Sequence, residues 1–222
     1  IEFSGSGEVF STSATDPSLK ILGGGQLRLV SGALLDSVHT TIGASGATNS
    51  VLEVKAGGWT NTASAKIGRG SVDVLDGGTA ITGALSIGAG TGPGSVHVTG
   101  DVSTLDVTGA LVVGDTTAGT LEIDKGVFSN TPLSTTPIIG KSAPGTVTVH
   151  GDDSSFSSYG RFQADRTLIV GDGSSGRLNV ERGGHVSIDP DLVVSGYGAN
   201  PAGEVIVDAQ GGVSTLVVLG GT

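Results

Sequence analysis

Short apolar segments with a period of two recur along the chain, and each is followed within a few residues by a turn that contains glycine. The eight copies of this first motif are Leu27-Arg28-Leu29, Leu52-Glu53-Val54, Val72-Asp73-Val74, Val96-His97-Val98, Leu121-Glu122-Ile123, Val147-Thr148-Val149, Leu178-Asn179-Val180 and Val205-Ile206-Val207. Because successive side chains of a β-strand point to opposite faces, this alternation predicts strands with one apolar face. No stretch keeps a 3.6-residue apolar period over three turns, so essentially no helix is expected.

A second motif lies between the copies of the first and consists of two apolar residues that flank a third residue, followed by glycine. Its members end at Ile42-Gly43, Ile67-Gly68, Ile87-Gly88, Val113-Gly114, Ile139-Gly140 and Val170-Gly171, with looser members at Leu22-Gly23, Val194-Ser195 and Leu219-Gly220. Copies of each motif follow one another at intervals of about 20 to 31 residues. Two motifs that repeat in the same order at this spacing are typical of a solenoid.

Each short strand needs a neighbour, because three to five residues cannot bury their own apolar face, whereas stacked copies build one continuous core. A coil repeats its strands in the same order, so like strands stack in parallel, while hairpins would make them antiparallel. Further short strands are expected between the motifs, at Ala80-Ile81, Asp101-Val102-Ser103 and His185-Val186-Ser187-Ile188. Corners favour glycine, which adopts positive φ freely, at Gly32, Gly57-Gly58, Gly77-Gly78, Gly100, Gly126, Gly151, Gly183-Gly184 and Gly211-Gly212.

The sequence therefore predicts an all-β chain that folds as a right-handed parallel β-helix (solenoid) of about eight to nine coils, with essentially no helix. At a strand separation of about 4.8 Å, such a stack is a rod roughly 40 Å long. Residues 1–222 form a single domain in this interpretation, with residues 1–7 as a candidate linker. The lack of methionine and the repeat motif at the end of the sequence further predict a piece of a longer protein.

Composition narrows the classes of function. With 40 glycines, 36% hydrophobic and 14% charged residues, the 222-residue chain is too apolar and too weakly charged for a disordered segment. A net charge of −10, with only 11 Lys and Arg, argues against nucleic acid as a partner. No apolar run approaches the roughly 18 residues of a membrane-spanning helix, so no direct membrane insertion is expected. Without cysteine the chain has neither a disulfide framework nor a thiolate metal site.

The alternation of strand, glycine turn and second strand resembles the passenger regions of bacterial autotransporters, the type V secretion family. Residues 176–184 and 168–173 carry the resemblance most clearly, and its repeat style covers nearly the whole chain from about Gly24 onward. The resemblance implies a β-helical stalk or adhesive passenger that is exported through an outer-membrane barrel and is then secreted or held at the bacterial cell surface.

The widest repeat unit, residues 147–178, holds the first candidate contact region. Its additional residues include three of the eight aromatic side chains, and insertions in solenoids often form the binding face. Stacking on sugars or a protein hot spot would suit its candidate contact residues, which are Phe156, Tyr159, Arg161, Phe162 and Arg166. In the alternative interpretation, Phe156 and Phe162 fold back and cover the coil as part of an ordinary loop.

Residues between the apolar anchors of each motif are expected to point outward. In the first motif they are mostly polar, as is typical of a solvated face, and they are Arg28, Glu53, Asp73, His97, Glu122, Thr148, Asn179 and Ile206. In the second motif they are Thr41, Lys66 and Ser86 and then five apolar residues in consecutive coils, Val112, Ile138, Ile169, Val193 and Val218. Since contiguous exposed apolar patches mark interacting surfaces, we expect this outer stripe to be covered, either by loops of its own coils or by a partner chain.

No catalytic residue, metal ligand or cofactor is predicted. The neighbouring pairs Asp152/Asp153 and Asp189/Asp191 are present, but a glycosidase needs two carboxyl groups that converge about 5 to 9.5 Å apart across a cleft. The four histidines have no metal-ligand spacing, and they are His39, His97, His150 and His185.

We therefore expect an extracellular stalk or adhesin-type module with a structural and surface-interaction role and no catalysis. Its expected partners are a host-surface protein or glycan, or further copies of itself bound through the outer stripe or the coil ends. Two alternatives stay open. One is a polysaccharide-active β-helix enzyme or a tailspike-like glycan-binding module, and the other is a self-assembling surface-layer or fibre subunit.

Overall fold

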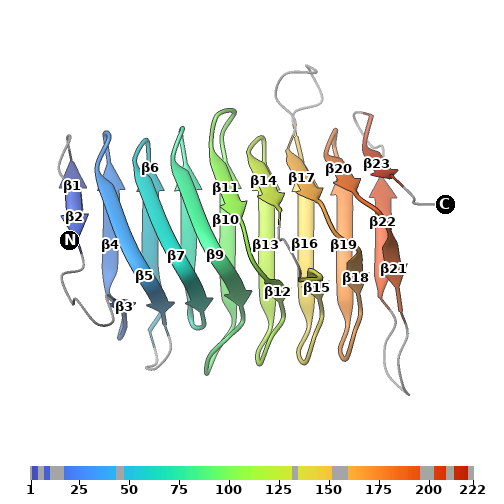
Figure 1. Cartoon of the computed structure of the whole chain (residues 1–222), viewed down its shortest axis with the longest axis horizontal. Helices are drawn as coiled ribbons and strands as arrows, with labels where there is room; N and C mark the ends of the chain where they lie inside the picture. The colour runs from blue at the N-terminus through green and yellow to red at the C-terminus, as the bar shows by residue number, and fades with distance from the viewer. Residues whose placement is uncertain are drawn as a thin grey trace.

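The chain folds as a parallel β-solenoid, which confirms the predicted fold class. The computed structural model describes residues 2–4, 8–10, 18–43, 48–131, 135–151, 160–195, 203–208 and 213–219, and these residues contain strands and turns but no helix. The strands form two sheets, and both extend along the length of the solenoid (Figure 1). The stack has about seven turns, slightly fewer than the eight to nine coils expected.

The first sheet stacks nine strands in sequence order. They are β1 (Glu2–Ser4), β4 (Gln26–Val30), β6 (Ser50–Lys55), β8 (Gly70–Leu75), β10 (Gly94–Thr99), β13 (Gly119–Asp124), β16 (Gly145–His150), β19 (Gly176–Glu181) and β22 (Glu204–Asp208). Their pairings are parallel, and like positions of the first motif lie side by side. Val96, for example, pairs with Val72 of the previous turn and with Leu121 of the next.

The second sheet changes its form along the solenoid. In the N-terminal turns it contains β2 (Glu8–Phe10), β3 (Ser18–Ile21) and the long strands β5 (Leu34–Ile42), β7 (Gly58–Ile67) and β9 (Thr79–Ile87). After β9 each long strand is replaced by two short ones, which form two branches (Figure 1). The upper branch is β11 (Thr104–Val107), β14 (Val127–Asn130), β17 (Arg161–Ala164), β20 (His185–Ile188) and β23 (Thr215–Val218). The lower branch is β12 (Leu111–Val113), β15 (Ile138–Ile139), β18 (Leu168–Val170) and β21 (Leu192–Val194).

The core is one continuous column of apolar side chains between the sheets. The apolar residues of the first motif point inward, and from Leu29 to Val180 they are at most 1% exposed. In the last described turn Val207 is 46% exposed, since no further described strand lies beyond β22. Burial of each such side chain stabilises the fold by about 1.5–3 kcal/mol, so the stack depends on contact between successive turns.

A buried polar ladder follows the bend in the second sheet. Asn61 donates from Nδ2 to Thr40 Oγ1 at 3.0 Å and to Ser37 Oγ at 3.3 Å. Thr82 Oγ1 donates to Asn61 Oδ1 at 3.3 Å in the next turn. Further along, the buried Asn130 donates to two backbone carbonyl groups of the preceding turn. These bonds pair the buried side-chain amide N–H groups of Asn61 and Asn130.

The corners after the first sheet use residues other than glycine at positive φ. These residues, with φ between 47° and 62°, are Ser31, Ala56, Asp76, Lys125 and Arg182. At Glu181–Gly184 both central residues, Arg182 and Gly183, have positive φ, and Gly184 N donates to Glu181 O at 3.0 Å, as in a type I′ turn. The sequence had indicated only the glycine of each such pair.

The predicted third strands are partly confirmed. β20 spans His185–Ile188 as expected, and Ala80-Ile81 lie within the long strand β9. The prediction of a strand at residues 101–103 is wrong. Gly100 has a φ of 103°, and Ser103 N donates to Gly100 O at 3.0 Å, so these residues form a turn. Val102 in that turn is 72% exposed, and the strand begins at Thr104. Within the candidate linker, residues 2–4 form β1 and pair with β4.

Candidate interaction surfaces

The first candidate contact region contains a core residue. Phe162 lies on β17 with its side chain fully buried and stacks on Phe128 of the previous turn. The prediction that Phe162 is a contact residue is therefore wrong. The side chain belongs to the main core and lies on a strand rather than in the ordinary loop of the alternative interpretation. Its inward direction follows from strand alternation, since Arg161 and Gln163 on either side of it are less buried.

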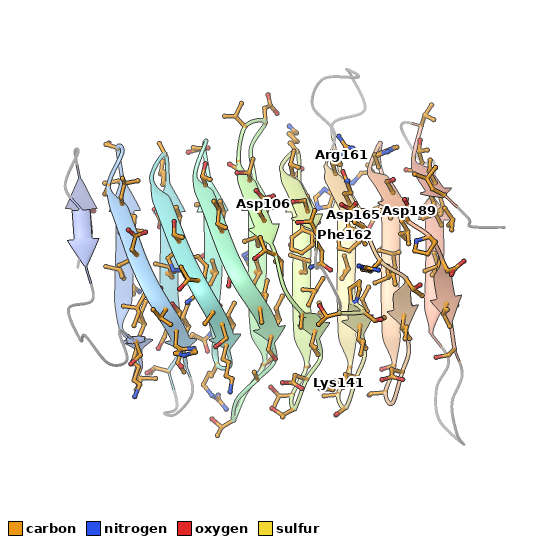
Figure 2. All side chains as sticks on the ribbon, in the orientation of Figure 1. Asp106, Lys141, Arg161, Phe162, Asp165 and Asp189 are labelled. Carbon is orange, nitrogen blue, oxygen red and sulfur yellow. The ribbon has the colours of Figure 1, made fainter. Side chains whose placement is uncertain are left out.

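The polar residues around Phe162 form a chain of hydrogen bonds on the outside of β17, and Figure 2 labels its end members Arg161 and Asp165 beside Phe162. Arg161 Nη2 donates to Gln163 Oε1 at 3.0 Å, and Gln163 Nε2 donates to Asp165 Oδ1 at 2.9 Å. Arg166 is exposed immediately after Asp165. Phe156 and Tyr159, the other two candidate contact residues, lie outside the described residues.

The outer stripe is present over four turns. Val112 pairs in register with Ile138, Ile138 with Ile169, and Ile169 with Val193. The first three side chains are half-buried, and Val193 is 41% exposed. Stacked side chains about 4.8 Å apart cover one another along the ladder, so part of this burial comes from the stripe itself.

Val218 does not belong to the stripe, which corrects the prediction. β23 pairs with β20 of the upper branch, and Val218 lies beside Ile188 rather than beside Val193. The apolar motif at residues 216–219 therefore continues the upper branch. From here on the outer stripe means Val112, Ile138, Ile169 and Val193.

The outer face of the first sheet carries a ladder of ion pairs where a plain solvated face was expected. Near its start, Arg28 lies 2.9 Å from Glu53 of the next turn and 3.0 Å from Glu2 of the previous one. Further along, His97 Nδ1 lies 2.7 Å from Asp73 Oδ1, and His97 Nε2 lies 3.9 Å from Glu122 Oε2. The side chains of this face therefore meet across turns with opposite charge.

Two histidines have shifted pKa values for different reasons. The hydrogen bond to Asp73 raises the pKa of His97, burial opposes the rise, and the charges of Asp73 and Glu122 add to it. Burial lowers the pKa of His185 on β20, and the positive charge of Arg161 in the preceding turn lowers it further. The folded state therefore favours the protonated form of His97 and the neutral form of His185.

The sequence did not predict that His97 and His150 both contact the carboxylate of Glu122. His150 Nε2 lies 2.9 Å from Glu122 Oε1, while His97 approaches the other oxygen of the same group. His97 and His150 are 53 positions apart in the sequence, so only the stacking of β10, β13 and β16 brings them together. Across the described residues, however, no group of three or more His, Cys, Asp or Glu is arranged to hold a metal ion.

The corners after the lower branch share a backbone hydrogen-bond arrangement that the sequence did not predict. Three consecutive backbone N–H groups, those of residues 141–143, donate to the single carbonyl oxygen of Gly114, each at 3.2 Å. Residues 172–174 repeat this arrangement around Gly140 O. Lys141, which Figure 2 labels, places its Nζ 3.6 Å from Asp115 Oδ1 of the preceding corner, and Asp115 Oδ2 accepts from Ser86 Oγ at 2.7 Å. These corners are thus tied to one another in the same order as the strands.

The two carboxylate pairs considered for an enzymatic site are Asp152/Asp153 and Asp189/Asp191. Asp152 and Asp153 lie outside the described residues. Asp189 follows β20 at a bend, where its backbone N donates to Ala164 O at 2.9 Å, and Asp191 follows two residues later (Figure 2).

Comparison of the chain with protein families and with known proteins finds no family model, curated protein or solved structure that matches it. Over the described part of the chain, no helix has the length and apolar character needed to cross a membrane.

Proposed function

We propose that the chain is an extracellular stalk or adhesin-type passenger module. It acts as a rigid spacer that holds contact residues at a distance from the bacterial cell surface. The observation that supports this function best is the unbroken register of the first sheet, in which nine strands pair in parallel in sequence order. Each interface between turns combines backbone hydrogen bonds with buried aliphatic side chains, so the stack keeps its shape as a unit. A spacer needs that property, and its role is structural, without a catalytic step.

The outer faces would supply the contacts of such a module. The first sheet offers charged side chains, with Arg28, Glu53 and His97 among them, and the second offers the outer stripe. A host-surface protein or a glycan is the partner class that a secreted or surface-exposed passenger would meet. The sequence segments between strands differ in length from turn to turn while the buried strand positions stay apolar, so contacts can vary without loss of the stack.

A surface-display experiment tests the spacer function. The chain is placed between an outer-membrane anchor and a terminal fluorescent reporter, and energy transfer to a membrane dye measures the distance of the reporter from the membrane. The unmodified chain should hold the reporter away from the membrane, and the double variant Ile87→Asp/Val147→Asp, with two charges in the core, should let it approach. Equal transfer in both would contradict the spacer function. Depolymerisation of an acidic polysaccharide by the purified chain would instead favour the enzymatic alternative.

The outer stripe favours a second function, self-association into a surface layer or fibre. Four stacked aliphatic residues on an outward face form the kind of apolar patch that associating surfaces use. Light scattering against protein concentration should show an oligomer that Ile138→Lys/Ile169→Lys abolishes. Asn179→Lys, on the outward face of β19, is the matched control and should leave association unchanged. A monomer at every concentration would exclude this function.

A further inference from the structure

The outer face of β3 and of the C-terminal halves of β5, β7 and β9 carries two columns of side chains that offer cations and hydroxyl groups. Strand register stacks the members of each column in successive turns. The first column is Ser18, His39, Ser64 and Ala84, and the second is Lys20, Thr41, Lys66 and Ser86. All eight side chains are exposed or half-buried, and none of them is a carboxylate. From here on the basic face means these eight residues together with Arg69, which follows β7.

The cations of the basic face have no anionic partner. Several cations elsewhere contact carboxylates, as in the pairs Arg28/Glu53, Lys55/Asp76, Lys141/Asp115 and Arg177/Glu204. No ion pair joins Lys20, Lys66 or Arg69 to a residue that the structure describes. The whole chain has a net charge of −10, so three unpaired cations on one side of it form a local positive surface.

The guanidinium of Arg69 is held in place by packing. Arg69 lies at the short corner between β7 and β8, and its side chain contacts Gly92 in the next corner. A Cβ at Gly92 would lie 2.8 Å from Arg69 Nε and 2.9 Å from its Nη2, so the glycine makes room for the guanidinium. Arg69 Nε has no hydrogen-bond partner. A positioned guanidinium without an acceptor is prepared for an oxyanion, which its planar fork of N–H groups fits.

Carboxylates are scarce around the basic face. Within β3, β5, β7 and β9 only Asp36 carries one, and it lies in the N-terminal half of β5. At the edge next to β12, the carboxylate of Asp115 accepts from Ser86 Oγ at 2.7 Å and lies 3.6 Å from Lys141 Nζ, so it is already paired. The described surroundings therefore leave the positive charge of the basic face open to an anion from outside the chain.

We propose that the basic face binds an acidic polysaccharide, whose carboxylate or sulfate groups contact Lys20, Lys66 and Arg69. Such a polymer spaces its charges along a row of sugar rings, and Lys20 and Lys66 are two turns apart, roughly 10 Å at the usual strand separation. The serine and threonine hydroxyls between the cations can donate to sugar hydroxyls and accept from them. A nucleic acid fits less well, because its dense phosphates would be repelled by the acidic remainder of the chain.

This inference rests on the contact role of the proposed module, for which it names a surface and a class of ligand. Binding and length are nevertheless separate observations, because the spacer experiment follows the distance of a reporter from the membrane. A chain that binds no polysaccharide can still hold the reporter away, and a chain that binds one can still fail as a spacer.

Fluorescence anisotropy tests the binding with the full chain in low salt. The probes are labelled oligogalacturonate for carboxylates, labelled dextran sulfate for sulfates and labelled neutral dextran as the uncharged comparison. One or both acidic probes should bind, neutral dextran should not, and added salt should weaken the binding because it screens exposed charges. Lys66→Gln/Arg69→Gln should weaken it about tenfold. The matched control Lys55→Gln/Arg177→Gln removes one lysine and one arginine from ion pairs on the first sheet and should leave the affinity nearly unchanged.

Gly92→Ala tests the positioned guanidinium without a change of charge. The added Cβ displaces the Arg69 side chain, so the affinity for the acidic probe should fall, although by less than in the double variant. Far-ultraviolet circular dichroism verifies that each variant keeps its strands. An affinity that Gly92→Ala leaves unchanged would contradict the role of Arg69.

Four results would overturn the proposal as a whole. They are the absence of binding by both acidic probes, equal binding of neutral dextran, an equal loss in the control pair, and tighter binding of duplex DNA than of either acidic probe. Light scattering without polysaccharide provides a further test. Self-association that Lys66→Gln/Arg69→Gln abolishes would assign the basic face to a second copy of the chain instead.

Discussion

The rings of Phe128 and Phe162 stack with a centroid distance of 5.1 Å and an angle of 5° between their planes. The two residues occupy the same register position on β14 and β17 and are fully buried. In the turns on either side, the same position holds Leu105 and Val186. The widest repeat unit is thus anchored to its predecessor through the core, whatever contacts its outer residues make.

Removal of one ring should destabilise the fold strongly. Phe162→Ala leaves a cavity beside Phe128, and truncations of buried aromatic residues cost about 3–5 kcal/mol of the free energy of unfolding. Urea denaturation followed by circular dichroism measures the change. Arg166→Ala, four residues away on the exposed side, is the control and should leave the midpoint nearly unchanged. Equal effects of the two substitutions would contradict an inward Phe162.

A charge introduced into the core should destabilise the fold more than the removal of a charge from the outer face. Ile87 on β9 is fully buried, and Ile87→Asp would place a carboxylate among aliphatic side chains with no partner, which should unfold several turns. Glu53→Gln removes one partner of the half-exposed Arg28 and should change little. Limited proteolysis compares the two. Rapid cleavage of Glu53→Gln, or resistance of Ile87→Asp, would be inconsistent with this assignment of faces.

Substitution of a corner glycine by alanine should destabilise the fold to a degree that depends on the space around that glycine. Gly88 has a φ of 81°, and a Cβ there would lie 2.0 Å from Thr117 O, so Gly88→Ala requires the next corner to move. Gly23 has a φ of 63° but nothing within 4 Å, so Gly23→Ala adds only the strain of a left-handed residue, about 1–2 kcal/mol. Thermal unfolding should show the larger loss for Gly88→Ala. The reverse order would mean that the corners do not stack.

Stability should depend on pH through His97 and His185 with opposite signs. The raised pKa of His97 means that its contribution is fully present below the unfolded value near 6.5 and is lost as the pH rises through the folded value. The lowered pKa of His185 means that its contribution is present above the unfolded value and is lost as the pH falls through the folded one. His97→Gln should remove the loss of folding stability that occurs as the pH rises. His185→Gln should remove the loss of folding stability that occurs as the pH falls.

Urea midpoints across pH for the two single variants separate these contributions, with His39→Gln as a third variant for comparison. His39 is bonded to Ser64 rather than to a carboxylate, so its substitution should leave both slopes in place. If His97→Gln kept the alkaline loss, the Asp73 contact would not be its source.

The strands and their register were predictable because they depend on local alternation. The alternation of Leu52 and Val54 with a polar residue predicts a strand from local sequence alone. The repeat then predicts that these two residues lie beside Val72 and Val74 of the next turn, as they do in the structure. Val218 was misplaced because its motif resembles the members of the lower branch, although its strand β23 pairs with β20 of the upper branch. A sequence does not state which of two ladders a short strand joins.

Contacts across turns were the part that sequence could not supply. His150 meets Glu122 diagonally, two positions off register, so no spacing in the sequence marks the pair. Phe162 was predicted to be a contact residue because it follows a long insertion in the sequence, across which the alternation of inward and outward positions cannot be traced. Lys125 and Arg182 adopt positive φ at corners where only glycine was expected, because the surrounding ladder imposes the turn.

Disulfide cross-linking tests the parallel stacking of like residues most directly, since the chain has no cysteine of its own. Thr148 and Asn179 pair in register on β16 and β19, and Cα atoms about 4.8 Å apart are within the span of a disulfide. Thr148→Cys with Asn179→Cys should form an intramolecular cross-link in the folded chain. Thr148→Cys with Ile206→Cys, two turns apart, should not. A folded chain in which the second pair cross-links and the first does not would contradict the solenoid.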